Sequence, residues 1–388
     1  MPLAYYLNPS VRPILAHDPP TRGPLAFHAW LPGYAPTPLV AAPALAEQLG
    51  IGQVLVKDES ARLGLPAFKI LGASWAVYRA LVERLGGEVG AWNTLADLRA
   101  HLAPLGPLTL VAATDGNHGR AVARMAALLG YDAHILVPSG TAQARIDAIA
   151  GEGAAVTVVD GTYDDAIARS AKEASPTHLV ISDTSWPGYE DVPRWVIDGY
   201  STILWEVDDE LSRNGYAHPD LVLVQMGVGA FASAVTRHYR RPASSARPRI
   251  VGVEPDTAAC VLASLRADAL TEVPGPHPSI MAGLNCGLPS LIAWPALQHG
   301  LDMAVAIPDD AARDAMRDLA TAGIVAGETG AAGLGGLAAL LTGPDADERR
   351  AQLGITATTR VLLFSTEGAT DPAAYAAIVG QSPIAGSE

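Results

Sequence analysis

Apolar and polar positions form two alternating series along the chain, and the first series lies between residues 108 and 182. Short apolar runs typical of buried strands are separated there by amphipathic segments long enough for helices. The predicted strands are 108–114, 133–138, 154–159 and 178–182, and the predicted helices are 118–130, 141–151 and 163–174. Strands joined by helices of this length form a parallel sheet with right-handed crossovers.

A second series predicts another parallel sheet in the C-terminal half. Its strands are expected at 221–225, 249–255, 303–308 and 360–364, and its helices at 232–240, 258–267, 309–323 and 330–341. A strand at 54–58 and a helix at 69–86 precede both series. The expected fold class is α/β, with two three-layer open α/β domains and mostly parallel sheets. We expect residues 1–85 and 205–388 to form the large domain, and residues 86–204 the small one.

Composition narrows the class of partner. Of all residues 49% are apolar and 17% are charged, as in ordinary globular proteins, and the net charge is −14. Nucleic acids and anionic membranes bind basic surfaces, so we expect neither as a partner. The N-terminal segment lacks the basic start and apolar core of a signal peptide, and no apolar run reaches the roughly 20 residues that span a bilayer. We therefore expect a cytoplasmic protein.

Two residue types with reactive side chains are scarce. The two cysteines, Cys260 and Cys286, are too few for a disulfide framework or a cysteine zinc site, so no metal is expected. They are either two buried thiols or one pair bridged across a loop. Lysine supplies only three of the 26 basic residues, namely Lys57, Lys69 and Lys172. Because lysine can lose a proton and form an imine whereas arginine cannot, each lysine is a candidate for amine chemistry.

Lys69 is the lysine whose surroundings best suit that chemistry. It begins a predicted helix directly after apolar residues. A helix N-terminus and an apolar environment both lower the pKa of an amine. The ordinary alternative for a lysine at the start of a helix is a solvated side chain.

Three turns that follow predicted strands carry small or polar residues suited to ligand binding. Ligands of open parallel sheets bind beyond the carboxyl ends of the strands. The turn at 114–119 places Asn117 between glycines, although a helix-capping turn is the alternative. The turn at 227–230 presents backbone N–H groups at a helix start, which suits an anion, although a tight connection is equally compatible. The turn at 365–368 places two hydroxyl groups after the last strand.

The order of these features resembles that of the fold-type II pyridoxal-phosphate enzymes, the group of threonine dehydratase and tryptophan synthase β. The resemblance extends from about residue 35 to residue 372. Within that group the chain looks most like the diaminopropionate ammonia-lyase family. The stretches that carry this similarity are 57–60, 64–69, 114–120, 183–189 and 365–368. Asp115 is the sharpest discriminator, because dehydratases usually carry a small residue at that position.

The resemblance implies how the chain holds its cofactor, pyridoxal 5'-phosphate. Lys69 would bind it as an imine, Phe68 would pack against its ring, and Asn117 would hydrogen-bond its phenolic oxygen. The large domain would carry most of the cofactor site. The phosphate would be bound by the backbone amides of Gly227, Val228, Gly229 and Ala230. The pyridine nitrogen would be hydrogen-bonded by the hydroxyl of Ser365 or Thr366.

The resemblance also implies the reaction, an α,β-elimination on D- or L-2,3-diaminopropionate that gives pyruvate and ammonia. Lys69 would remove the α-proton of the L-isomer and Asp115 that of the D-isomer. Asp183 would bind the β-ammonium group or exchange a proton with it, although a loop cap is its ordinary alternative. His118 is expected to be a structural neighbour. The partner is then a small amino-acid substrate, and the family implies a homodimer.

Other functions are less compatible with the same residues. A serine or threonine dehydratase-like lyase acting on another β-substituted amino acid is the nearest alternative, and Asp115 and Asp183 argue against it. A non-catalytic homologue that binds the cofactor would not need Lys69, Asn117 and both aspartates together. A nucleotide-binding dehydrogenase would need the glycine fingerprint of a dinucleotide site in the first strand–helix unit, and the sequence there lacks it.

Overall fold

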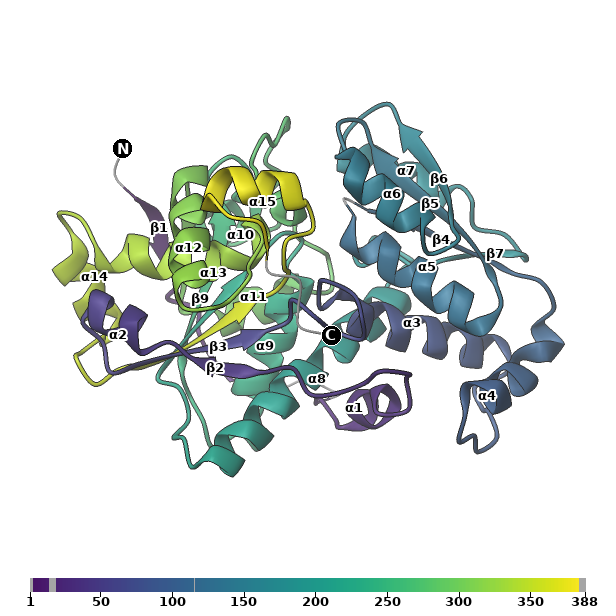
Figure 1. Ribbon diagram of the computed structural model, residues 1–388, viewed down its shortest axis with the longest axis horizontal. Helices are drawn as coiled ribbons and strands as arrows, with labels where there is room; N and C mark the ends of the chain where they lie inside the picture. Colours follow the sequence, from purple (N-terminus) through teal and green to yellow (C-terminus); the bar gives the residue numbers. More distant parts are fainter. Residues whose placement is uncertain (1–2, 14–18, 115, 384–388) are drawn as a thin grey trace. The chain divides into compact units, whose positions relative to one another are not determined.

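The computed structural model describes residues 3–13, 19–114 and 116–383, and the chain forms two compact units. Unit 1 comprises Met1–Pro20, Pro36–Ala61 and Ile203–Glu388, and unit 2 comprises Thr21–Ala35 and Arg62–Thr202. Each unit contains one sheet, and Figure 1 labels most of the strands. Asp115 lies outside the described residues, so its predicted role stays a prediction.

Unit 1 is built on a seven-stranded sheet in the order β1-β10-β9-β8-β11-β3-β2. The strands are β1 (Ala4–Leu7), β2 (Leu39–Ala41), β3 (Gln53–Asp58), β8 (Leu221–Gln225), β9 (Arg249–Pro255), β10 (Met303–Ile307) and β11 (Arg360–Ser365). The five central strands run parallel, whereas β1 and β2 pair antiparallel at the two edges. The mostly parallel α/β architecture predicted from the sequence is confirmed.

Helices cover both faces of this sheet, as the alternation of side chains along β11 shows. Leu363 points into the main apolar core beside α13, whereas the next residue, Phe364, contacts the ring of Phe231 in α9 at 5.1 Å between centroids. Successive strand residues point to opposite faces, so α13 and α9 lie on opposite sides. The helices of unit 1 are α2 (Pro43–Leu49), α9 (Ala230–Arg240), α10 (Cys260–Ala267), α11 (Trp294–Gly300), α12 (Asp309–Thr321), α13 (Glu328–Leu341), α14 (Ala346–Leu353) and α15 (Pro372–Val379).

Unit 2 is built on a four-stranded parallel sheet in the order β6-β5-β4-β7. Its strands are β4 (Thr109–Ala113), β5 (Asp132–Pro138), β6 (Ala155–Val159) and β7 (His178–Val180). Its helices are α1 (Gly23–His28), α3 (Lys69–Arg84), α4 (Leu95–Leu102), α5 (Asn117–Leu129), α6 (Gln143–Ala150) and α7 (Tyr163–Ala171). The long helix α8 (Asp191–Asn214) begins in unit 2 and ends in unit 1.

The compact units differ from the expected division, which assigned residues 1–85 and 205–388 to one domain and 86–204 to the other. Residues 21–35 and 62–85 belong to the smaller unit instead. The physical reason is the packing of α3, which lies against α5 and α1 and buries residues such as Leu71 and Val77 completely. Periodicity predicts that α3 has an apolar face, but it does not tell which sheet that face covers.

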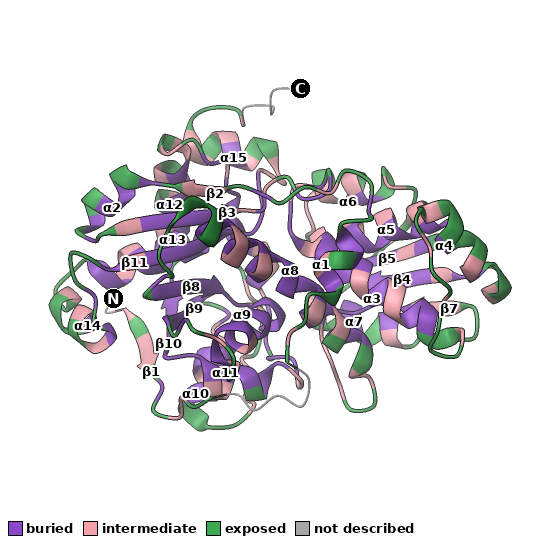
Figure 2. Cartoon of the chain, turned by 90° about the horizontal axis from the view of Figure 1, so that it is seen from below, coloured by how far each residue is buried: buried purple, intermediate pink, exposed green. Residues whose placement is uncertain are grey.

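Burial follows the order of the strands within each sheet, as the purple segments in Figure 2 show. All five residues of β8 are buried because β8 has neighbours on both sides, whereas the edge strand β6 has no residue in the buried class. Within the described part of the chain, no helix is long and apolar enough to cross a membrane.

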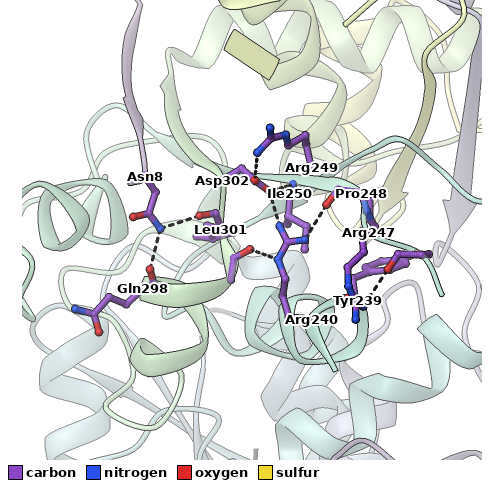
Figure 3. A network of polar contacts seen from close by, with 12 residues as sticks. Asn8, Tyr239, Arg240, Arg247, Pro248, Arg249, Ile250, Gln298, Leu301 and Asp302 are labelled. Atoms are coloured by element: carbon purple, nitrogen blue, oxygen red, sulfur yellow. Dashed lines mark hydrogen bonds and ion pairs between the residues drawn. The ribbon is translucent and has the colours of Figure 1, made fainter. Parts of the chain in front are cut away.

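A buried ionic network fixes one corner of unit 1 (Figure 3). The carboxylate of Asp302 accepts hydrogen bonds from Arg240 Nη2, from Arg249 Nη1 at 2.8 Å and from the backbone of Ile250 at 2.7 Å. Arg240 also donates to the carbonyl oxygens of Gly300 and Pro248, each at 3.0 Å. Because both charges are paired and hydrogen-bonded, the network joins the start of β10 to β9 and α9 without an unpaired buried charge.

We expect Asp302→Ala to destabilise the protein by about 3–5 kcal/mol, because Arg240 would remain buried without its counter-ion. The matched control is Asp314→Ala, which removes an ion pair to Arg317 whose aspartate side chain is 74% exposed. That substitution should change stability by less than about 1 kcal/mol. Urea unfolding of both variants and of the wild type measures the difference. Equal losses in the two variants would contradict the role of the Asp302 network.

Candidate active site

Lys69 and Asp183, which are 114 positions apart in the sequence, form an ion pair in unit 2. Lys69 is the first residue of α3, and Asp183 follows β7. The Lys69 Nζ atom donates to Asp183 Oδ2 at 2.6 Å, and the two side chains are 19% and 5% exposed. The structure therefore brings two of the three predicted catalytic residues into direct contact.

Asp183 is held as a carboxylate. Tyr163 at the start of α7 donates its hydroxyl to the second oxygen, Asp183 Oδ1, at 3.0 Å. Burial alone would raise the pKa of Asp183, but the Lys69 ammonium, the nearby His118 ring and the hydrogen bonds from Lys69 and Tyr163 outweigh it. As a result, the pKa of Asp183 lies well below its usual range.

The loop that carries Asp183 is pinned by Tyr189. The Tyr189 hydroxyl donates to the carbonyl of Val180 at 2.8 Å and accepts the N–H of Ser182 at 3.1 Å. Its ring stacks on Trp186 with 4.2 Å between centroids and 12° between planes. Burial raises the pKa of the Tyr189 hydroxyl, which therefore stays protonated. The stretch 183–189 thus has a structural role as well as a chemical one.

The Asn117 turn connects β4 to α5, and Asn117 is the half-buried first residue of that helix. The buried ring of His118 lies with Nε2 at 2.8 Å from the carbonyl of Ile181, as expected of a structural neighbour. A Cβ atom at Gly119 would lie 2.5 Å from the side chain of Ile135, so a glycine is needed where α5 crosses β5. The glycine pattern of this turn therefore has a packing cause.

The environments of the three lysines differ sharply. Lys57 is completely buried and bound to Glu206 at 3.0 Å and Glu210 at 2.9 Å, so its amine is held by two carboxylates. Lys172 is exposed after the end of α7. Lys69 combines partial exposure with an ion pair to Asp183. It is therefore the lysine best placed to react with an aldehyde.

Phe68 directly precedes this lysine and is buried, with 7% of its surface exposed. Its ring lies 4.7 Å from the ring of Tyr200 in α8, and the Lys69 amine is 5.7 Å from the centre of the Phe68 ring. The start of α3 is thus fixed by aromatic packing on α8.

Unit 1 carries the turn predicted to receive a phosphate, residues 227–230. It joins β8 to α9, an 11-residue helix whose first N–H groups have no acceptor within the helix. Gly229 adopts φ +87°, a left-handed conformation that favours glycine, and an added Cβ atom would lie 2.4 Å from Leu297. Val228 and Ala230 are small or medium residues that are nearly buried. The turn can present amides to an anion without a cationic side chain.

The hydroxyl turn after β11 is organised by Gln225. The Gln225 amide donates to the carbonyls of Phe364 at 2.7 Å and Gly330 at 2.9 Å, and lies 3.4 Å from Thr366 Oγ1. Ser365 is completely buried, and its Oγ has no hydrogen-bond partner among the described residues. A buried hydroxyl without a partner is costly, so it marks a place where a bound group is expected to complete the hydrogen bonding.

Cys260 and Cys286 are two buried thiols, which was one of the two possibilities left open by the sequence. Both lie next to the turn at 227–230: Cys260 Sγ lies 3.8 Å from the carbonyl of Gly227, and a Cβ atom at Gly227 would be 3.0 Å from Cys286 Sγ. Burial and the neighbouring Glu254 raise the pKa of the Cys260 thiol. At neutral pH it is therefore protonated.

Four residues next to the predicted ones were missed by sequence reasoning, namely Tyr163, Tyr189, Gln225 and Glu254. Glu254 accepts the N–H groups of Val261 and Leu262 at the start of α10, and burial raises its pKa to about 8. Two of the four had a partial sequence signal: the predicted helix 163–174 begins at Tyr163, and Tyr189 ends the stretch 183–189 that carries the family resemblance. The contacts themselves join residues far apart in the sequence.

Three features fit pyridoxal phosphate: a partly exposed lysine amine, a turn that can present amides to a phosphate, and a buried hydroxyl that lacks a hydrogen-bond partner among the described residues. By contrast, the described residues contain no cluster of three or more His, Cys, Asp or Glu side chains that could hold a metal ion.

Comparison with known proteins identifies the family. A family model described as "pyridoxal-phosphate dependent enzyme" matches residues 31–351. The chain is 36% identical to the diaminopropionate ammonia-lyase of Salmonella typhimurium over 365 residues, which cover 92% of this chain and 90% of that protein. It is 37% identical to the enzyme of the same name from Escherichia coli, with 91% and 89% covered.

A solved structure gives the same result. The crystal structure of Escherichia coli diaminopropionate ammonia-lyase in complex with an aminoacrylate–pyridoxal-phosphate azomethine reaction intermediate matches with a TM-score of 0.88 and 34% identity. The match covers 97% of this chain and 96% of that one. The chain belongs to the diaminopropionate ammonia-lyase family of pyridoxal-phosphate-dependent enzymes.

Proposed function

We propose that the protein converts 2,3-diaminopropionate and water into pyruvate and two molecules of ammonia. The observation that carries this proposal is the ion pair between Lys69 Nζ and Asp183 Oδ2 at 2.6 Å. It places a carboxylate that stays ionised beside the amine best placed to hold the cofactor. A substrate with two amino groups needs such an anion for its second ammonium group, whereas serine and threonine do not.

The cofactor-holding residues in this proposal are those predicted from the sequence. Lys69 supplies the amine, the amides of residues 227–230 bind the phosphate, Asn117 hydrogen-bonds the phenolic oxygen and Phe68 packs against the ring. For the pyridine nitrogen we favour Ser365 over Thr366, because Thr366 Oγ1 already lies near Gln225 while Ser365 Oγ lacks a partner among the described residues. When bound, pyridoxal phosphate withdraws electrons from the substrate, which makes the α-proton removable and the β-amino group able to depart.

The residues of unit 2 then move protons. The Lys69 amine removes the α-proton of the L-isomer once the substrate has taken its place. Asp183 binds the β-ammonium group of the substrate in the position that the Lys69 ammonium occupies in the structure. An ion pair of this kind keeps the leaving nitrogen protonated, and a protonated amine leaves far more readily than an amide ion. For the D-isomer we propose Asp115 as the base.

We further infer that the protein acts in the cytoplasm as a homodimer. The resemblance to the family supports the homodimer. Light scattering on the purified protein tests the oligomeric state, since a dimer has twice the mass of the chain.

We expect the purified holoenzyme to form pyruvate from 2,3-diaminopropionate at least about tenfold faster than from L-serine or L-threonine, because only the first substrate has a second ammonium for Asp183. A coupled lactate dehydrogenase assay with D- and L-substrates measures this preference. Faster turnover of L-serine or L-threonine would favour the dehydratase-like alternative.

Lys69 should be the lysine that carries the cofactor. Borohydride reduction fixes a pyridoxyl group on the amine that binds it, and with only three lysines in the chain, peptide mass spectrometry can assign that amine. We expect the label on Lys69, and we expect Lys69→Ala to lose it together with at least about a thousandfold of turnover. A label on Lys57 or Lys172 would contradict the proposal.

Gly229→Ala should weaken binding of the cofactor by about tenfold or more. A side chain at φ +87° costs about 1–2 kcal/mol and would push the amides of the turn out of line. Gly354→Ala is the matched control, because Gly354 also has a left-handed φ (+68°) but ends α14 with open space around it. Titration of both apo-proteins with pyridoxal phosphate gives the dissociation constants. Similar affinities would show that the turn does not receive the phosphate.

A further inference from the structure

The two oxygens of the Asp183 carboxylate have different donors. The Lys69 ammonium binds Oδ2 at 2.6 Å, and the Tyr163 hydroxyl binds Oδ1 at 3.0 Å. Because Asp183 is only 5% exposed, water cannot readily replace a lost donor. The state of this carboxylate therefore depends on both neighbours.

The position of Tyr163 is closely specified by its surroundings. Thr162 caps the helix in front of it: its side chain accepts the N–H of Asp165, whose carboxylate accepts the N–H of Thr162 at 2.8 Å. The Tyr163 ring packs on the small apolar core of unit 2 together with Trp186 and Tyr189. Helix cap and ring packing together hold the hydroxyl at the carboxylate without help from Lys69.

The two donors differ in what happens to them during the proposed reaction. The amine of Lys69 must leave the ion pair whenever it is engaged by the cofactor or acts on a proton, and a positive charge then no longer faces Oδ2. Tyr163 takes no part in those steps. A buried carboxylate that loses its cation needs its remaining hydrogen bonds in order to stay ionised.

We propose that Tyr163 is a positioning residue for the ammonia-lyase reaction, whose hydroxyl keeps the Asp183 carboxylate ionised and in one orientation while Lys69 is engaged elsewhere. The inference deepens the proposed function and depends on it for its catalytic meaning. Among the described residues, the titratable groups that face Asp183 come from four elements: Lys69 from α3, His118 from α5, Tyr163 from α7 and Tyr189 from the loop after β7. Among them, Tyr163 is the neutral group that donates directly to a carboxylate oxygen.

The sign of the effect follows from the hydrogen bond. The Tyr163 hydroxyl donates to the anionic form of Asp183 and so lowers its pKa; removing the hydroxyl raises that pKa. As the pH is lowered, activity that requires the ionised Asp183 carboxylate is then lost at a higher pH than in the wild type. A single hydrogen bond to a carboxylate corresponds to a shift of about one pH unit.

The first experiment needs neither cofactor nor turnover. In Lys69→Gln apo-protein the cation is absent, and infrared titration follows protonation of Asp183, with Lys69→Gln/Asp183→Asn to assign the band. Adding Tyr163→Phe to Lys69→Gln should raise the Asp183 midpoint by about one pH unit. Equal midpoints would overturn the proposal. This result stands whether or not the wild type turns over 2,3-diaminopropionate, so failure of the inference and failure of the proposed function are separable.

The second experiment uses the holoenzyme. In Tyr163→Phe, the acid limb of kcat/KM for 2,3-diaminopropionate should move to higher pH by about one unit, with a smaller change at the pH optimum. Two tyrosines serve as controls: Tyr131, whose hydroxyl lies 3.4 Å from the carbonyl of Leu102, and Tyr189, whose hydroxyl is hydrogen-bonded to the backbone of Val180 and Ser182.

The controls separate positioning from general loss of structure. Tyr131→Phe should leave the acid limb in place, and Tyr189→Phe should lower thermal stability more than it moves that limb. An acid limb of Tyr163→Phe that coincides with the wild type, or one that moves equally in all three variants, would overturn the proposal. If the Lys69→Gln/Tyr163→Phe variant does not fold, this comparison of the three single variants tests the proposal instead.

Discussion

The proposed chemistry of this protein depends on one buried carboxylate, that of Asp183, staying charged although little of its side chain is exposed to water. Burial opposes the charge of Asp183, and only specific neighbours reverse that tendency. The neighbours come from separate elements of unit 2, since Lys69 begins α3 and Tyr163 begins α7. The start of each helix must therefore be accurately placed, and aromatic packing in front of α3 and a capping box in front of α7 do this.

The turns of unit 1 differ from the Asp183 region of unit 2 because they present neutral polar groups instead of charged ones. The turn between β8 and α9 presents backbone amides, and the turn after β11 presents hydroxyls. Gln225 connects the two turns: it ends β8, and its amide binds the carbonyl of Phe364 in β11 at 2.7 Å. The central strands thus supply the scaffold, and the segments that follow them supply the groups that we propose to bind the cofactor, at the place where parallel sheets bind their ligands.

Sequence patterns predicted much of this, and the limits of those patterns have physical causes. The two strand–helix series were recognised because buried parallel strands are continuous apolar runs, such as 221–225, and the core helices are amphipathic. Short elements such as β1, β2 and α1 were missed because they have too few residues to show a period. The assignment of α3 to the wrong domain shows that an apolar face does not identify its partner. Likewise, Lys69 and Asp183 were predicted one by one, but their contact and the contribution of Tyr163 depend on tertiary structure.

The two edge strands of the seven-stranded sheet limit how the protein can pair with other chains. An edge strand offers unpaired backbone N–H and C=O groups to any other extended chain. Long, flat edge strands therefore promote aggregation. In this sheet both edge strands are antiparallel to their neighbours and short: β1 has four residues and β2 has three. Such short edge strands offer another chain few backbone groups for hydrogen bonding. A sheet whose five central strands are rich in Val, Leu and Ile is therefore protected against edge-to-edge aggregation into fibres.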